Sequence, residues 1–541
     1  MDNENVCKPI DLEAHNSIYA PALEELSFNL NDLLGNLPCT HGDDDDNTTA
    51  LCLPNEIWIM IFKRLSHGDL LQVNLVCKEW CQLARTTVLK RTSTLVINKQ
   101  NVNDIYHLME DSSLNYEKVM IDDLLDEFTN VEQAVLLKIF KHLGSNIVEL
   151  TVYRLSTLSA INDVLPKLKE LYLGKVRSKE NVPVNFNKFS NLEGLLMPLY
   201  NQALLSSLNQ MSRLRLEKLS LTLDCLHQGY FDLLSMCAQS LRWLQLSIPT
   251  KVNSTTLIRL QETFTKVSQL ERLDICAVGN TECRRAILEN LPKEAPLKAL
   301  NFRLGEDHDL LELIVRKWSN SLECLTLTCH KLTRNSVEQL SFLSGRLRCL
   351  CLYSIRTGPK DLLHSIAPKI NKTLTELKLN FPIPAVALFS VLIQRLPNLT
   401  TLYLLGHTSN ITDEEIGYIF RYLTHLRKLS LPPCVGKNNI KYLCSKPNIS
   451  NLKGLRTLAS CLCPIRVLHI INVDFQFKDL SQLHLHDCNR NKRLTQMFLD
   501  IGRYLPALEV LWADMFDNND VQKIRESCPR LRRAFQYRRM F

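Results

Sequence analysis

Residues 399–431 read LTTLYLLGHTSNITDEEIGYIFRYLTHLRKLSL, and this stretch holds two copies of one six-residue pattern, LxxLxL, at 399–404 and 426–431. The alternation within each copy predicts a β-strand, with the leucines on one face and the intervening residues on the other. The ten residues Asp413–Tyr422 between the copies are predicted to form a helix. One strand followed by one helix is therefore the building unit of this part of the chain.

The same pattern recurs through most of the chain. Eleven copies, in which Ile, Met or Phe can replace a leucine, follow one another at intervals of 24 to 29 residues. They are LKELYL (168–173), LEGLLM (192–197), LEKLSL (216–221), LRWLQL (241–246), LERLDI (270–275), LKALNF (297–302), LECLTL (322–327), LRCLCL (347–352), LTELKL (374–379), LTTLYL (399–404) and LRKLSL (426–431). A period of this length indicates leucine-rich repeats, whose units bury their apolar residues against neighbouring units.

We accordingly expect an α/β fold, a leucine-rich-repeat solenoid over residues 116–541. Its curved parallel sheet should lie on the concave side and its helices on the convex side. The first, fourth and sixth positions of each copy should point into the core, and the intervening residues should face solvent on the concave side.

The two ends of the array are less regular. Upstream copies are YEKVMI (116–121) and IVELTV (147–152), and downstream copies are LSQLHL (480–485), LEVLWA (508–513) and LRRAFQ (531–536). Between 431 and 480 two registers compete, LRTLAS (455–460) and IRVLHI (465–470). We favour the first, because the ninth position of the repeat is then Cys463, in line with Cys434 and Cys488 in neighbouring copies. Against it, Ser460 would occupy an inward position.

A different pattern lies near the N-terminus, where residues 53–80 read LPNEIWIMIFKRLSHGDLLQVNLVCKEW. Apolar residues recur at helical spacing before the SHG break at 66–68 and again after it. Two helices this short and this apolar cannot bury both stripes against each other. We therefore expect one face to bind a partner, in the manner of a groove-binding helix.

This stretch closely resembles the F-box, through the opening LPNEI, the centre IFKRLSHGDLL and the closing VCKEW. The resemblance covers about residues 51–95. Together with the repeats it makes the chain similar to the leucine-rich-repeat subclass of F-box proteins. The domains expected are an acidic, disordered tail (1–50), the F-box (51–95), a connector (96–115) and the array (116–541).

The resemblance implies a substrate-recognition subunit of an SCF-type E3 ubiquitin ligase. Its F-box would dock on the Skp adaptor, and through it on the cullin and RING subunits, while the repeats bind an unidentified protein substrate. The chain itself would be a non-catalytic adaptor. The contacts with Skp implied by the resemblance are Leu53, Pro54, Ile57, Ile61, Phe62, Leu65, Leu70, Val76, Cys77 and Trp80. The alternative is a scaffold or tether that binds partners through its repeats without ligase output.

The outward strand positions form the candidate substrate surface, because exposed Trp and Tyr side chains are over-represented among binding hot spots. By register these candidates are Tyr172, Trp243, Arg303, Tyr353, Lys378, Tyr403, His484 and Trp512.

No catalytic constellation or cofactor motif occurs, so we expect neither an enzyme nor a cofactor. The run LHLHDC places His484, His486 and Cys488 close together, as Cys461 and Cys463 are, but exposed polar residues explain both groups better than a metal does. Nineteen cysteines without a CxxC pair indicate reduced, partly buried thiols.

Charge and hydropathy limit which partners and which cell compartments we expect for the chain. Residues 1–50 carry eleven acids and one Lys, a balance of −10, so the rest carries +17 of the total of +7. This moderate excess over a large surface does not predict nucleic-acid binding. No apolar run of 18 residues predicts a membrane span, and the acidic N-terminus is unlike a signal peptide. We expect the chain in the cytosol, the nucleus or both.

Overall fold

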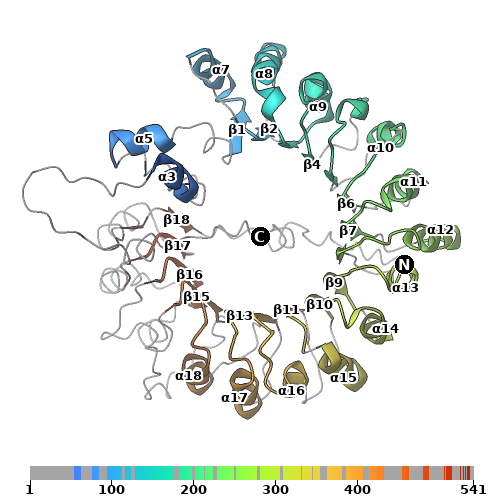
Figure 1. Cartoon of the computed structure of the whole chain (residues 1–541), viewed down its shortest axis with the longest axis vertical. Helices are drawn as coiled ribbons and strands as arrows, with labels where there is room; N and C mark the ends of the chain where they lie inside the picture. Colours follow the sequence, from blue (N-terminus) through green and yellow to red (C-terminus); the bar gives the residue numbers. More distant parts are fainter. Residues whose placement is uncertain are drawn as a thin grey trace, which may run out of the picture. The chain divides into compact units, whose positions relative to one another are not determined.

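A computed structural model of the chain shows strands and helices alternating along most of its length (Figure 1). The described residues are 54–62, 73, 76–84, 94–111, 116–123, 128–174, 182–197, 202–211, 214–222, 228–248, 252–276, 281–304, 309–329, 332–343, 345–353, 362–380, 386–405, 413–431, 454–461, 479–486, 505, 507–513, 524, 528, 530–531 and 533–536. The predicted acidic tail, 1–50, lies outside them. Among the helices that are described, none is long and apolar enough to cross a membrane.

Eighteen strands are described, and they are short and parallel. From β1 to β4, and again from β6 to β18, each strand pairs in parallel with the next one along the chain. The strands are β1 (Thr94–Asn98), β2 (Lys118–Asp122), β3 (Glu149–Val152), β4 (Glu170–Leu173), β5 (Gly194–Met197), β6 (Lys218–Thr222), β7 (Trp243–Ser247), β8 (Arg272–Cys276), β9 (Ala299–Arg303), β10 (Cys324–Thr328), β11 (Cys349–Tyr353), β12 (Glu376–Leu379), β13 (Thr401–Leu404), β14 (Lys428–Ser430), β15 (Thr457–Cys461), β16 (Gln482–His486), β17 (Val510–Ala513) and β18 (Arg533–Gln536).

An α-helix is described in every interval from β1 to β14 except the one between β4 and β5. Within each unit these helices lie on the outer side of the strands, and the strands line the inner, concave side (Figure 1). The repeat helices are α7 (Val102–Asp111), α8 (Asn130–Leu143), α9 (Leu155–Ile161), α10 (Gln202–Asn209), α11 (Gln228–Cys237), α12 (Ser254–Phe264), α13 (Thr281–Asn290), α14 (Asp309–Trp318), α15 (Arg334–Leu343), α16 (Leu362–Ile366), α17 (Val386–Gln394) and α18 (Asp413–Tyr422). Three short 3-10 turns, Gly144–Asn146, Asn162–Val164 and Phe186–Lys188, complete the connections. The predicted α/β leucine-rich-repeat architecture is confirmed.

The register of the strands follows the sequence pattern closely. Every strand from β2 to β18 begins at the third position of a six-residue copy identified in the sequence. In β7 the inward Leu244 and Leu246 are fully buried, whereas Trp243 and Gln245 between them are half-buried. Between 431 and 480, where two registers compete, the structure has the first one, LRTLAS (455–460). Strand β15 lies in this copy and pairs with β14 and β16.

The chain divides into two compact units, residues 1–195 and residues 196–541. The first holds the helices α3 (Asn55–Phe62) and α5 (Lys78–Ala84) and the strands β1 to β4. Its helix α8 starts at a capping box, in which the Thr129 hydroxyl accepts from the Glu132 backbone N–H and the Glu132 carboxylate accepts from the Thr129 N–H. This arrangement satisfies two of the donors that a helix leaves open at its start.

The second unit holds β6 to β18 and buries a row of leucines from each repeat. Neighbouring repeat helices also form hydrogen bonds with each other. The ammonium group of Lys317, on α14, donates to the carbonyl oxygens of Leu288, Glu289 and Leu291 at the end of α13. The last carbonyls of a helix have no partner of their own, so this lysine caps one repeat from the next.

One predicted boundary is wrong. The segment 96–115, interpreted as a connector, contains the rest of strand β1 and the whole of helix α7, and β1 pairs in register with β2. The parallel sheet therefore begins at Thr94, inside the stretch assigned to the F-box and connector. The pattern escaped detection because this copy reads TSTLVI (92–97), with a threonine in the first position.

Candidate functional site

The two F-box helices enclose a small aromatic core. Trp58, Phe62 and Val73 are buried, and Ile61, Trp80 and Leu83 pack against them. The Trp58 and Trp80 ring centroids lie 4.4 Å apart, and Phe62 meets Trp80 edge-on at 5.4 Å. Aromatic pairs in such arrangements add about 0.5–1.5 kcal/mol to the free energy gained by burial. This cluster fixes how α3 and α5 pack together.

Other apolar residues of the same segment remain on the surface. Ile57 is 39% exposed, Met60 57% and Val76 61%. Ile57 and Met60 are three residues apart on α3 and therefore share a face of that helix. Because Ile57 and Met60 are exposed on one face of the same helix, this face is a candidate surface for a partner.

The structure divides the ten predicted Skp contacts into different groups. Pro54, Ile57 and Val76 are exposed, Ile61, Cys77 and Trp80 are half-buried, and Leu53, Leu65 and Leu70 lie outside the described residues. Phe62 belongs to the internal core, as does Trp58, which the sequence analysis left out of its contact set. The apolar residues of this segment are thus only partly buried against one another, as expected for helices too short and too apolar to bury both stripes.

The concave face carries the second set of candidates. Tyr172 is exposed on β4, and Trp243, Arg303, Tyr353, Lys378 and Tyr403 are half-buried on the solvent-facing side of their strands. The backbone register sets His484 beside Trp512, but their side chains lie outside the described set. Register also places Lys378 directly beside Tyr403 on neighbouring strands. Arg303 and Tyr353, by contrast, are separated by the intervening strand β10.

Trp243 is held in place by a buried carboxylate. Its indole Nε1 donates to Asp274 Oδ2 at 2.8 Å, and the Arg272 Nε lies 2.8 Å from the same oxygen. The Arg272 guanidinium also lies 5.8 Å from the Trp243 ring centroid. Because the hydrogen bond holds the indole Nε1 and the guanidinium lies over the ring, this tryptophan is restrained before a partner binds and loses less conformational entropy on binding. Sequence analysis missed Asp274 and Arg272, although both are third- or fifth-position residues of LERLDI.

A second polar group surrounds Lys378. Its Nζ lies 2.6 Å from Glu376 Oε1 and 5.2 Å from the Tyr403 ring centroid. Burial opposes the charged form, but charge interactions with Cys351 and Glu376 outweigh it and raise the pKa of Lys378 to about 12. Burial likewise raises the pKa of the Tyr403 hydroxyl. Lys378 therefore stays cationic, and Tyr403 stays a neutral hydrogen-bonding group.

Cysteines adjoin this group on the neighbouring strand. The Cys349 and Cys351 sulfurs lie 3.6 Å apart on β11, and Glu376 is the partner of Cys349 on β12. Hydrogen bonding with Cys324 and Cys351 raises the pKa of Cys349, whereas hydrogen bonding with Cys349 lowers the pKa of Cys351. Sequence analysis overlooked this cluster, although LRCLCL and LTELKL place all three residues at outward positions.

Comparison with known proteins identifies part of the chain. Residues 50–95 match the family model for F-box-like domains, so the chain carries an F-box-like domain there. The comparison with curated proteins found no match.

Among solved structures, the Rad7 and Elc1 complex in yeast shares 13% identity, with 86% of this chain and 89% of that chain covered and a TM-score of 0.33. The leucine-rich repeat-containing protein LegL7 from Legionella pneumophila shares 16% identity, covering 52% of this chain and 97% of that one, with a TM-score of 0.34. The mouse RP105/MD-1 complex shares 14% identity over 78% of each chain, with a TM-score of 0.31. Similarity at this level carries no information on partners or activity.

Proposed function

We propose that this chain is the substrate-recognition subunit of an SCF-type E3 ubiquitin ligase. Its F-box-like domain would bind the Skp adaptor, which joins it to the cullin and RING subunits. Its leucine-rich repeats would bind the protein to be ubiquitinated. The observation that carries this proposal is the F-box-like domain at residues 50–95, with apolar side chains left exposed around its aromatic core.

The exposed residues suggest how the adaptor would be bound. The core of Trp58 and Phe62 already fixes the helices, so Ile57, Met60 and Val76 are available for an external partner. Burying each such side chain in an interface is worth about 1.5–3 kcal/mol before the costs of association are subtracted. Ile57 and Val76 belong to the contact set that the F-box resemblance implies, and Met60 extends it.

The chain would position the target protein and would not itself catalyse ubiquitin transfer. Holding a target beside the ubiquitin-charged enzyme converts an encounter in solution into a reaction within one complex. The rigid Trp243 and the Lys378–Tyr403 pair, on the solvent-facing side of the strands, are our candidate contacts for the target.

Adaptor binding is tested with the double variant Ile57→Ala, Val76→Ala in the full chain. We expect its affinity for purified Skp to fall at least tenfold while its circular dichroism stays that of wild type, because both side chains are exposed. The exposed Gln82 on α5 provides the matched control, and Gln82→Ala should bind Skp normally. Unchanged Skp affinity in the double variant, or no Skp binding by wild type, would contradict the proposal.

Target binding is tested with Trp243→Ala, Tyr403→Ala, by affinity purification and mass spectrometry against wild type. Partners that bind the concave face should be depleted from the variant while Skp and cullin remain. Phe342→Ala removes an exposed aromatic from the helical side and serves as control. If every interactor of wild type persists in the double variant, the target does not bind through these residues.

The alternative function is a scaffold or tether without ligase output. It would use the same binding surfaces, but it would not shorten the lifetime of the proteins that it binds. A ligase subunit shortens the lifetime of the protein that it binds. Removal of this chain should therefore lengthen the half-life of at least one partner recovered by the wild type and lost from the concave variant. If all such half-lives stay unchanged, the scaffold is the correct function.

A further inference from the structure

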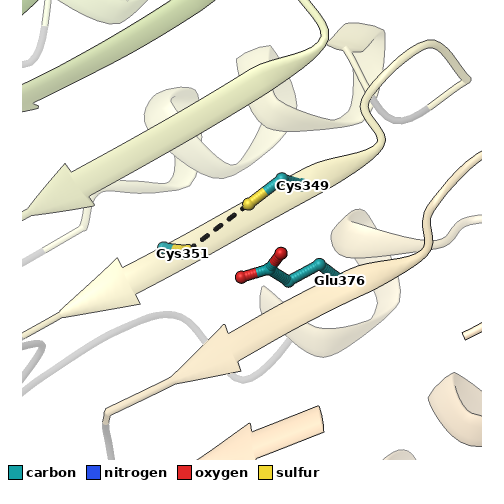
Figure 2. Close-up of side chains that lie close together, drawn as sticks. All are labelled: Cys349, Cys351 and Glu376. Carbon is teal, nitrogen blue, oxygen red and sulfur yellow. Dashed lines mark hydrogen bonds between the residues drawn. The ribbon is translucent and has the colours of Figure 1, made fainter. Parts of the chain in front are cut away.

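Three potential metal ligands meet on the concave face of the second unit. Cys349 and Cys351 extend from β11 and Glu376 extends from β12, and one ligand atom from each lies within 4.8 Å of the other two (Figure 2). No other group of three His, Cys, Asp or Glu side chains comes together in this way within the described part of the chain. Glu376 and Cys349 are opposed in the parallel register, so the backbone pairing itself brings them together.

The separation of the two sulfurs suits a tetrahedral cation. Zinc binds thiolate sulfur at about 2.3 Å, and two such ligands at a tetrahedral angle are about 3.8 Å apart. The Cys349 and Cys351 sulfurs are 3.6 Å apart, far beyond a disulfide bond of about 2.05 Å. Alternate residues of one strand face the same side, which explains why a Cys-Leu-Cys sequence presents both thiols together.

The charges around the three ligands also fit a bound cation. Two thiolates and a carboxylate around Zn²⁺ leave one net negative charge, and the Lys378 ammonium, 2.6 Å from Glu376 Oε1, is placed to offset it. Lys378 occupies only one carboxylate oxygen, so the other can act as a ligand. Hydrogen-bonding groups of this kind behind the ligands orient them and strengthen metal sites.

We propose that Cys349, Cys351 and Glu376 bind one thiophilic divalent cation, Zn²⁺, on the concave face, with a water molecule as the fourth ligand. Both thiols release their protons when the ion binds. Thiolate-rich sites favour zinc over magnesium or calcium, which prefer oxygen ligands. The ion would join β11 to β12 beside Lys378 and Tyr403, and its open position would face the surface that we assign to the target. This site is independent of the F-box and of Skp binding.

Zinc affinity is measured on the reduced, full-length chain by competition with a chromophoric chelator. Wild type should bind Zn²⁺, and Cys349→Ser, Cys351→Ser should lose one equivalent or bind it at least tenfold more weakly. Cys276→Ser is the matched control, because Cys276, like Cys349, is half-buried and outward on a strand of this unit but has no place in the cluster. Equal zinc binding by wild type and the double variant would overturn the proposal.

A second measurement avoids substitution, so it is informative even if the variant folds poorly. Reduced wild type is alkylated with and without Zn²⁺, and modification of each cysteine is quantified by mass spectrometry. The ion should slow alkylation of the half-buried Cys349 at least tenfold and leave the half-buried Cys276 unaffected. An alkylation rate of Cys349 that is the same with and without Zn²⁺ would exclude the site.

Discussion

The F-box helices and the repeat array bury their apolar side chains in different ways. Each repeat places its leucines against the repeats before and after it, and in β7 the inward Leu244 and Leu246 are fully buried. Among the residues described between 54 and 84, Trp58, Phe62 and Val73 are buried together, and Ile57, Met60 and Val76 stay on the surface. Each repeat of the array has a similar unit on either side to bury its apolar residues, whereas this small cluster covers only part of its own.

This difference separates two tasks within one chain. In the array, the residues that point inward form the core and stabilise the fold. The alternate residues, on the other side of the strands, are the ones available for binding. In the F-box the single helix α3 supplies both core residues, Trp58 and Phe62, and exposed apolar residues, Ile57 and Met60. Substitutions should therefore separate stability from binding cleanly in the array, and separate them in the F-box only when Trp58 and its neighbours are left intact.

The largest effect is expected at Trp58. Replacing a buried tryptophan with alanine costs about 3–5 kcal/mol, and this two-helix core has few other contacts to offset the loss. In Trp58→Ala we expect limited proteolysis to cut within residues 54–84 while the repeat array stays resistant, and Skp binding to be lost as a consequence. Resistance of both segments equal to wild type would mean that the array, and not the aromatic cluster, stabilises the F-box.

A smaller and more local effect is expected in the array. Leu325 is fully buried in β10, so Leu325→Ala should lower the free energy of unfolding there by about 2–5 kcal/mol. Thr328→Ala, on the same strand but facing outward, should change it by less than about 0.5 kcal/mol. Hydrogen exchange of the β9, β10 and β11 amides measures both. Equal protection in the two variants would contradict the assignment of inward and outward faces.

The smallest effect concerns pH and Asp123, which is fully buried in the first unit. Burial raises its pKa above the ordinary value of 3.8, outweighing its bonds from the Thr157 hydroxyl (2.7 Å) and the Tyr153 N–H (3.3 Å). Since the folded pKa exceeds the unfolded one, the folded state holds this proton more tightly. The contribution of Asp123 to stability is therefore greatest below pH 3.8 and declines as pH rises through the folded pKa.

The comparison with Asp123→Asn isolates this contribution, because other carboxylates titrate in both proteins. The free energy of unfolding of wild type, relative to the variant, should decrease as pH rises from about 4 and become constant once the folded pKa is passed. A difference that instead increases with pH over this interval would show that the hydrogen bonds to Asp123 outweigh its burial.

The sequence alone determined the architecture, since the LxxLxL period states locally which residues form a strand and which face each side chain takes. Every strand from β2 onward starts where the pattern places it, including β15 in the ambiguous segment. The motif at 53–80 also identified the F-box-like domain. The exception is β1, whose copy has Thr92 in place of the first leucine, so that only pairing with β2 reveals it.

Tertiary structure decided which residues of each candidate site act together. Ile57 and Trp58 are adjacent and both apolar, yet one is exposed and the other buried, because the packing of α5 selects one face of α3. Likewise the sequence placed Cys349, Cys351 and Glu376 on the same face, but their approach depends on side-chain rotamers and on the register of two strands. A repeat pattern depends on neighbouring residues and can be recognised in the sequence. A site is made by contacts between segments that are distant in the sequence and that only folding brings together.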